Sequence, residues 1–193
     1  MRRILRLLAC GAVVLSLVAC TPTGRAVGDT QDSMPSIAHD STHKTDITVG
    51  LVGSTDTAAD KKAIDALADD TLNVYYASLD TSGDSETADK IAATAQQGVT
   101  DFVDRAVKIV IISGIDVTDA NRDSWNQALT NAREAGIPVA LLNPKHAPED
   151  ELLYAAILNT DDAASAKSVS IADAVITITR DEPHDRTIAD ATE

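Results

Sequence analysis

The stretch KIVIISGIDVTDANRDSWNQALTNAREAGIPVALLN, residues 108–143, decides the fold. Its first part, Ile109–Ile112, is a continuous run of β-branched apolar residues, which is typical of a strand buried on both faces of a parallel sheet. The middle part predicts a helix, because apolar residues three and four positions apart share one helix face. These residues are Trp125, Ala128, Leu129 and Ala132. The last part, IPVALLN, reads as a second strand.

The end of this helix carries three consistent signals. Gly136 stands where a left-handed residue ends a helix, Ile137 can cover the last turn, and Pro138 prevents continuation. The stretch therefore predicts a right-handed strand–helix–strand unit of a parallel sheet. Ligands of such sheets generally meet the loops beyond the carboxyl ends of the strands, so a site is expected there.

The same alternation continues on both sides of this stretch. Further strands are predicted at residues 47–52, 72–79 and 153–158. Further helices are predicted at residues 57–69, from residue 84 or 85 to about 106, and from residue 161 or 162 to about 173. Val175–Thr179 can finish that last helix or form a short strand, and its β-branched alternation favours the strand. The pattern predicts a three-layer α/β sandwich with a mostly parallel sheet of about five strands.

The amino terminus reads as a targeting segment. Residues 1–19 contain three arginines and no acidic residue, and they continue into an apolar run that is too short for a spanning helix between two domains. The run ends in Leu17-Val18-Ala19-Cys20, which resembles a bacterial lipobox. That resemblance implies cleavage before Cys20 and attachment of lipid to its sulfur. Since Cys10 leaves with the leader, no free thiol is expected in the folded part, which excludes disulfides and thiolate metal sites.

Three further regions follow the leader. Residues 20–46 are predicted to be the lipidated cysteine and a disordered tether, because this segment is rich in small and polar residues without periodicity. Residues 47–180 form the predicted α/β lobe, and residues 181–193 a frayed tail. His39 and His43 have a helical metal-ligand spacing, but nothing else predicts a helix there, so no metal site is predicted.

The charge balance restricts the partners. The formal net charge is −14, and residues 20–193 keep 13 basic residues against 30 acidic ones. Nucleic acids and anionic membrane surfaces are therefore predicted to be poor partners, because binding them needs a basic surface.

Polar residues follow nearly every predicted strand and form the candidate ligand-binding set. The set is Ser54, Thr55, Asp56, Asp80, Asp116, Asn143, Asp161 and Asp162. Each of them could instead act as a helix cap or turn former. Together they make a neutral-to-acidic rim rich in hydroxyls and carboxylates, which suits polyols or cations better than phosphates.

Known catalytic and cofactor motifs are not matched. Residues 50–55, GLVGST, fit neither the phosphate-binding loop nor the dinucleotide fingerprint, and no nucleophile elbow is present. The chain has only five aromatic residues, none of them in the loops where a flavin would stack. We therefore predict a protein that is not an enzyme and carries no cofactor.

Four phrases of the chain resemble the amino-terminal lobe of type I periplasmic substrate-binding proteins, the ribose- and galactose-binding kind. They are ITVGLV (47–52), VKIVIISGID (107–116), NAREAGIPVALLN (131–143) and ILNTDDAASA (157–166). The resemblance implies capture of a small solute, typically a sugar, for the membrane subunits of an ABC importer. Asp161 matches the acidic residue of the family after strand five, whereas Asn143-Pro144 replaces its Asp-Arg pair after strand four.

The resemblance covers one lobe, whereas the family closes two lobes around its ligand. We therefore predict a lipid-anchored, extracytoplasmic protein whose single lobe binds a small polar solute. The alternative is an envelope interaction or structural module that has lost solute binding together with the second lobe.

Overall fold

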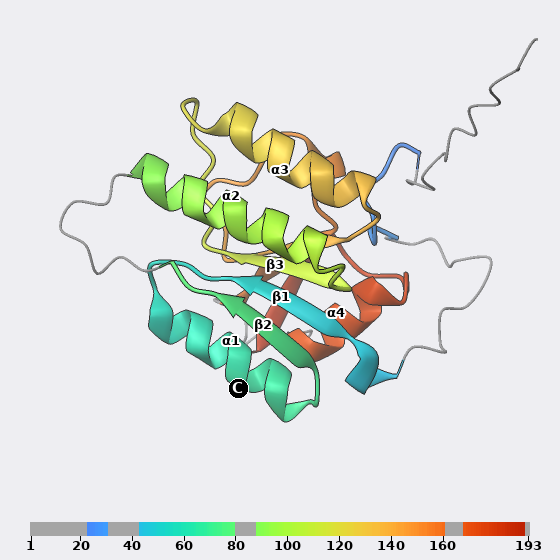
Figure 1. The fold of residues 1–193 in the computed structure, drawn as a ribbon. Helices are drawn as coiled ribbons and strands as arrows, with labels where there is room; N and C mark the ends of the chain where they lie inside the picture. The colour runs from blue at the N-terminus through green and yellow to red at the C-terminus, as the bar shows by residue number, and fades with distance from the viewer. Residues whose placement is uncertain (1–22, 31–42, 80–87, 161–167, 192–193) are drawn as a thin grey trace, which may run out of the picture.

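The computed structural model describes residues 23–30, 43–79, 88–160 and 168–191. The described chain forms a seven-stranded sheet in the order β2-β1-β3-β4-β5-β7-β6, with every pairing parallel. Helices cover both faces of this sheet, so the predicted three-layer α/β sandwich is confirmed (Figure 1). The sheet has two strands more than the five expected from the sequence.

The elements have the following bounds. The strands are β1 Thr48–Val52, β2 Asn73–Ala77, β3 Ile109–Ser113, β4 Val139–Leu142, β5 Ala156–Asn159, β6 Val169–Ser170 and β7 Thr187–Ala191. The helices are α1 Thr57–Asp69, α2 Ala88–Asp104, α3 Arg122–Glu134 and α4 Ile171–Thr179. Two short 3₁₀ helices, η1 Lys44–Asp46 and η2 Glu151–Leu153, precede β1 and β5.

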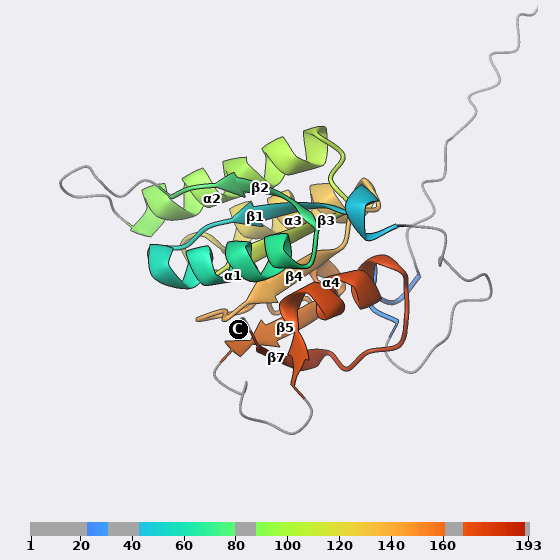
Figure 2. The same ribbon diagram turned by 90° about the horizontal axis from the view of Figure 1, so that it is seen from below.

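Each face of the sheet has its own apolar core. One core lies between the sheet and helices α1 and α4, and the other between the sheet and helices α2 and α3 (Figure 2). All five residues of β3 are buried, as expected for a central strand covered on both faces. The four apolar residues that predicted helix α3 are all buried as well.

The predicted end of α3 is confirmed. Gly136 has a φ of +72°, and the amide of Ile137 donates to the Ala132 carbonyl at 3.0 Å. A left-handed residue at this place satisfies carbonyls of the last turn that would otherwise lack partners. Strand β4 begins directly after Pro138, as the sequence predicts.

Two elements near the carboxyl terminus differ from the prediction. Val175–Thr179 belongs to helix α4, which starts at Ile171, and Val169–Ser170, predicted as part of the last helix, is strand β6. The predicted helix start at residue 161 or 162 lies outside the described residues. Ser170 caps α4 by accepting a hydrogen bond from the Asp173 amide at 3.0 Å. Burial of Val175, Ile176 and Ile178 against the sheet outweighs the β preference of their branched side chains.

Strand five is also shorter than predicted. Helix η2 takes Glu151–Leu153, so β5 starts at Ala156 instead of Leu153. Asp150 caps η2 by accepting from the Leu152 amide at 2.9 Å. The apolar side chains of Leu153 and Tyr154 are buried here without belonging to a strand.

The predicted frayed tail is wrong for residues 187–191. They form β7, which pairs with β5 in the register Ile157 to Thr187 and with β6 on its other side. The pairing with β5 is not local in the sequence, because β6 and α4 lie between β5 and β7 in the chain.

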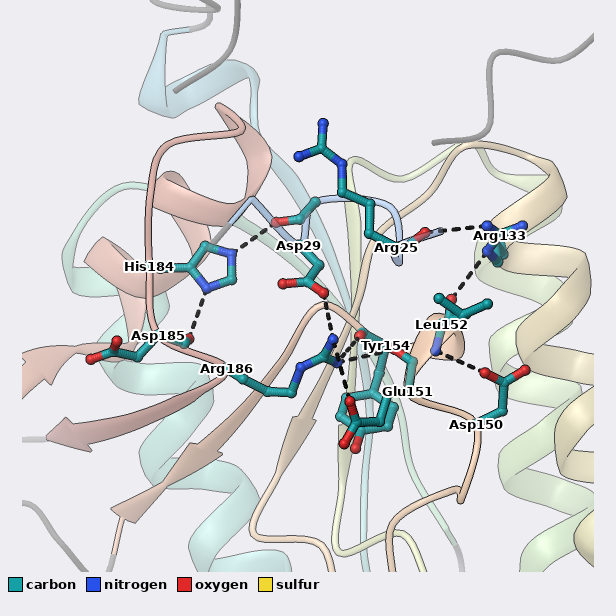
Figure 3. A network of polar contacts seen from close by, with 11 residues as sticks. Arg25, Asp29, Arg133, Asp150, Glu151, Leu152, Tyr154, His184, Asp185 and Arg186 are labelled. Carbon is teal, nitrogen blue, oxygen red and sulfur yellow. Dashed lines mark hydrogen bonds and ion pairs between the residues drawn. The ribbon is translucent and has the colours of Figure 1, made fainter. Parts of the chain in front are cut away.

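The prediction of a disordered tether is wrong for residues 23–30, which we call the N-terminal strap. Ala26, Asp29 and Thr30 in the strap are buried. The carboxylate of Asp29 pairs with the guanidinium of Arg186, and the Gly28 carbonyl lies 2.8 Å from Nε2 of His184 (Figure 3). The strap therefore packs against the segment that leads into β7.

The strap lies at the amino ends of the strands. Gly28 lies directly against Pro138, which precedes β4, and against Ile178 near the end of α4. The guanidinium of Arg133, in the last turn of α3, donates to the Arg25 carbonyl at 3.2 Å (Figure 3). This end of the sheet is opposite to the carboxyl ends, where the candidate site is expected.

Candidate functional site

A cavity of about 120 Å³ lies at the carboxyl ends of β1 and β3, between the starts of α2 and α3. Its polar lining is made by Ser54, Thr55, Ser113, Asp116, Thr118, Asn121 and Lys145. Its apolar lining is made by Leu79, Ile91, Ala92, Ala95, Ile112 and Ile115, with the indole of Trp125. Three of the eight predicted ligand-binding residues, Ser54, Thr55 and Asp116, thus lie together.

The loop between β1 and α1 is held by the buried carboxylate of Asp60. The Ser54 amide donates to Oδ2 of Asp60 at 2.7 Å, and the Ser54 hydroxyl donates to Oδ1 at 3.0 Å. The hydroxyl of Tyr76 in β2 also donates to Oδ2 at 3.0 Å. These three hydrogen bonds compensate for burial of the carboxylate and fix the place of Ser54 beside the cavity.

Asp60 was not predicted as a site residue, although the sequence contains a signal for it. Asp60, Ala63 and Leu67 are spaced i, i+3 and i+7, and all three are buried on one face of α1. An acidic residue on the apolar face of a helix requires a partner, because burial of an unpaired carboxylate is costly. The identity of that partner cannot be read from helical spacing.

The same contacts raise the pKa of Tyr76 above its ordinary value. Burial is the largest cause, followed by the hydrogen bond to Asp60 and the negative charge of Asp60. Each of these disfavours the phenolate. The neutral phenol is therefore part of the structure that positions the β1–α1 loop.

Two predicted binding residues have structural roles at this end of the sheet. Asp56 caps α1, since its carboxylate accepts from the Ala59 amide at 3.0 Å. Asn143 exchanges two hydrogen bonds with Thr160, at 2.7 and 2.9 Å, and so joins the ends of β4 and β5. Neither residue lines the cavity.

Asp116 lines the cavity and is also tied to a neighbouring loop. Its Oδ1 lies 2.7 Å from Nδ1 of His146, and its backbone carbonyl accepts from Nδ2 of Asn121 at 3.1 Å. Asn121 also accepts from the Thr118 amide at 2.8 Å, so it orders the loop that leads into α3. Asn121 and His146 were not predicted from the sequence, because neither follows a strand directly.

Trp125 supplies the most unusual polar group of the cavity. Its side chain is only 2% exposed, and its Nε1–H has no acceptor among the described residues. Trp125 lies on the buried face of α3, as its spacing predicts, but it was not predicted as a site residue. Its place in the first turn after the β3–α3 loop is a signal that its indole lies near the carboxyl ends of the strands.

The remaining predicted residues, Asp80, Asp161, Asp162 and the lipidation site Cys20, lie outside the described residues. Within the described ranges, no group of three or more His, Cys, Asp or Glu residues has a metal-binding arrangement. The helices of the described chain include none with the length and hydropathy needed to cross a membrane.

No protein-family model matches the chain, and no curated protein sequence matches it. Among solved structures, it is similar to a galactofuranose-binding protein, with 21% identity over 63% of this chain and a TM-score of 0.46. It is also similar to the periplasmic binding protein component of the arabinose ABC transporter from Shewanella sp. ANA-3, with 18% identity over 62% of this chain and a TM-score of 0.42. Both are sugar-binding proteins, and the similarity spans only 38% and 37% of their chains.

A third similar structure has a different description. It is a protein from Burkholderia pseudomallei named as pilus assembly-related, with 18% identity over 75% of this chain, 97% coverage of its own chain and a TM-score of 0.45. With such identities and TM-scores below 0.5, these similarities identify neither the function nor the ligand of this chain.

Proposed function

We propose that the protein is a surface-tethered lipoprotein whose α/β lobe binds a small polar solute non-covalently, as the solute-binding component of an ABC importer does. The observation that carries the proposal is the cavity at the carboxyl ends of β1 and β3, lined by Ser54, Thr55 and Asp116. In open α/β sheets, this is the edge where ligands generally bind.

The cavity walls are organised by the protein itself. Asp60 holds the β1–α1 loop, and Asn121 holds the β3–α3 loop through its contacts with Asp116 and Thr118. Loops that are ordered before binding lower the entropic cost of capturing a ligand. This favours a reversible binding site over a flexible surface.

The size of the cavity favours a site that a partner completes. Sites for small molecules typically enclose about 300–1,000 Å³, whereas this cavity measures about 120 Å³. A second lobe, supplied by another chain or by a second copy, would exclude more water and strengthen the buried polar contacts. The importer membrane subunits are the other partners in this proposal.

The membrane anchor in the proposal is lipid on Cys20. Its support is the basic and then apolar segment of residues 1–19, followed by Leu17-Val18-Ala19-Cys20. Such an anchor places the folded lobe on the extracytoplasmic side of the membrane. Loss of labelled-lipid incorporation in Cys20→Ala tests it.

Solute binding is tested on residues 20–193 with Cys20→Ala, so that the N-terminal strap is kept. A panel of sugars, polyols and other small solutes is scanned for an increase in melting temperature. Saturable stabilisation is expected, amounting to about 2.7 kcal/mol at a solute concentration of 100 times Kd.

A matched pair of variants in one loop provides the control. Asp116→Asn removes a charge from the cavity lining and is expected to weaken binding, whereas Asp119→Asn removes a side-chain charge that is 93% exposed and outside the cavity. Equal binding by both variants would contradict the proposed site. Stabilisation by no solute of the panel would contradict solute capture.

An interaction module is the second candidate, favoured by the exposed edge of the sheet. Strand β2 is an edge strand whose Tyr75 and Tyr76 are 46% and 39% exposed. Exposed aromatic residues are enriched in protein interfaces. Co-purification of an envelope protein that is lost in Tyr75→Ser, in a chain that binds no solute, would favour this candidate.

A further inference from the structure

We propose that the cavity takes a small molecule with one carbonyl acceptor on an apolar body, rather than the polyol expected from its polar rim. This inference rests on the proposed solute-binding function and specifies its ligand. Three observations support it: the buried indole N–H donor of Trp125, the hydrogen bonds within the protein that already occupy Asp60 and Asp56, and the apolar walls of the cavity.

The indole Nε1–H of Trp125 requires an acceptor. The side chain is 2% exposed and lines the cavity, and no acceptor among the described residues reaches Nε1. Indole can only donate, and a buried donor without a partner is unfavourable. A ligand oxygen beside Trp125 would remove this deficit.

Two of the three carboxylates near the cavity, those of Asp60 and Asp56, are used within the protein and do not line the cavity. Asp60 accepts three hydrogen bonds, and Asp56 caps helix α1. Asp116 faces the cavity from its rim, with Oδ1 held by His146. The hydroxyl of Ser54 is also engaged, because it donates to Asp60 and accepts from the Asp56 amide at 3.0 Å.

The apolar wall disfavours binding of a ligand that carries a hydroxyl group on every carbon. Leu79, Ile91, Ala92, Ala95 and Ile112 offer such groups no hydrogen bond. A polar group buried without a compensating hydrogen bond costs free energy, whereas alkyl groups gain by burial against these side chains. A molecule with a single polar end fits both parts of the cavity.

The volume and the charge at the rim define the ligand further. A cavity of about 120 Å³ corresponds to about four water molecules at about 30 Å³ each, so a ligand of about four to six non-hydrogen atoms fits. Lys145 and Asp116 both line the cavity and carry opposite charges. Because these charges offset one another, a neutral amide is expected to bind at least as well as a carboxylate.

Three probes of equal size test the inference. Butyramide, butyrate and glycerol each have six non-hydrogen atoms; butyramide has one amide carbonyl, butyrate has one carboxylate, and glycerol is a polyol. They are titrated against residues 20–193 carrying Cys20→Ala. Trp125 is the single tryptophan of the chain, so its indole N–H gives one assigned signal in a ¹H–¹⁵N spectrum.

We expect saturable binding of butyramide, with a downfield shift of the indole proton as the hydrogen bond forms, and no saturable shift with glycerol. Trp125→Phe keeps the aromatic bulk and removes the donor, and it should weaken butyramide binding about tenfold. Ser124→Ala, a neighbouring substitution outside the cavity lining, is the control that should keep binding unchanged.

The possible outcomes separate this inference from the proposed function. Saturable glycerol binding that equals or exceeds butyramide binding would overturn the inference and leave solute capture standing. Butyramide binding without a shift of the indole signal would refute the role of Trp125, even if Trp125→Phe fails to fold. If none of the probes and no other solute binds, both proposals are wrong.

Discussion

At the scale of single residues, Asp60 shows how a polar side chain inside the core determines the site. Its carboxylate accepts from Ser54 twice and from Tyr76 once, and so connects β1, α1 and β2. Ser54 was predicted to contact ligand, but its hydroxyl is used within the protein. Its contribution to the site is the shape of the loop.

The raised pKa of Tyr76 leads to a prediction for alkaline pH. The phenol ionises more readily in the unfolded chain, where its pKa is near 10, than in the folded protein. The stabilisation by the neutral phenol is therefore present below about pH 10 and is lost as the pH rises through the folded-state pKa. We expect wild type to lose more unfolding free energy between about pH 9 and 11 than Tyr76→Phe does.

Urea unfolding at several pH values measures this difference. Tyr154, whose pKa is also raised, mainly by burial, is present in both proteins and cancels in the comparison. Tyr75→Phe in the same strand is the control and should retain the alkaline loss of wild type. Parallel pH curves for wild type and Tyr76→Phe would contradict the prediction.

At the scale of elements, the close contact between β1 and α2 depends on Gly50. A Cβ at this position would lie 2.5 Å from Cγ of Phe102. This contact lies on the side of the sheet that α3 also covers, in the core that reaches the cavity. A change in their spacing would therefore also displace Ala92 and Ala95 in the cavity wall.

Gly50→Ala is expected to destabilise the protein by about 1–3 kcal/mol, because the added methyl group overpacks the core. Gly136→Ala is a matched control, since nothing lies within 4 Å of its Cβ position and only its φ of +72° is unfavourable. That control should cost about 1–2 kcal/mol. Adding Phe102→Leu should recover stability in Gly50→Ala and not in Gly136→Ala. Urea unfolding of the four variants measures this. Equal effects of Phe102→Leu in both backgrounds would contradict the steric contact.

At the scale of the whole molecule, the N-terminal strap relates the proposed anchor to the candidate site. Only two residues separate Cys20 from Thr23, and such a short segment spans about 10 Å at most. The strap lies at the amino ends of the strands, and the cavity lies at their carboxyl ends. In the proposed lipoprotein, the amino-end face is therefore close to the bilayer and the cavity faces away from it.

This orientation is tested with single fluorophores on the lipidated protein in vesicles that carry nitroxide headgroups. Labels are attached to Lys108→Cys at the amino end or to Asp119→Cys at the carboxyl end. In the proposed lipoprotein, an introduced cysteine is the single free thiol, because the proposal has Cys10 removed with the leader and Cys20 bound to lipid. Stronger quenching at position 108 than at position 119 is expected.

A strap variant provides the control for this measurement. Asp29→Ala removes the ion pair with Arg186 and should reduce the difference between the two labels, because the tether becomes longer. Equal quenching at both positions in the wild-type background would contradict the orientation. Failure of the protein to float with the vesicles would instead contradict the anchor at Cys20.

The sequence by itself determined the elements whose signals are local. Helix α1 begins at Thr57 and ends at Asp69 as predicted, and α3 ends at the expected glycine. Apolar spacing, caps and turn residues act over a few positions, so they can be read from neighbouring residues. They also placed Ser54, Thr55 and Asp116 at one end of the sheet, because parallel strands end at a common edge.

Only the tertiary structure decided the contacts between distant segments. Strand β7 exists because β5 offers it a pairing edge, and Asp29 is ordered because Arg186, 157 positions away, neutralises its charge. At the cavity, the hydrogen bond between Ser54 and Asp60, and the lack of an acceptor for the Trp125 indole among the described residues, likewise follow from packing. Whether a polar group is free to bind a ligand depends on which partners the fold brings within reach, and that information is not local in the sequence.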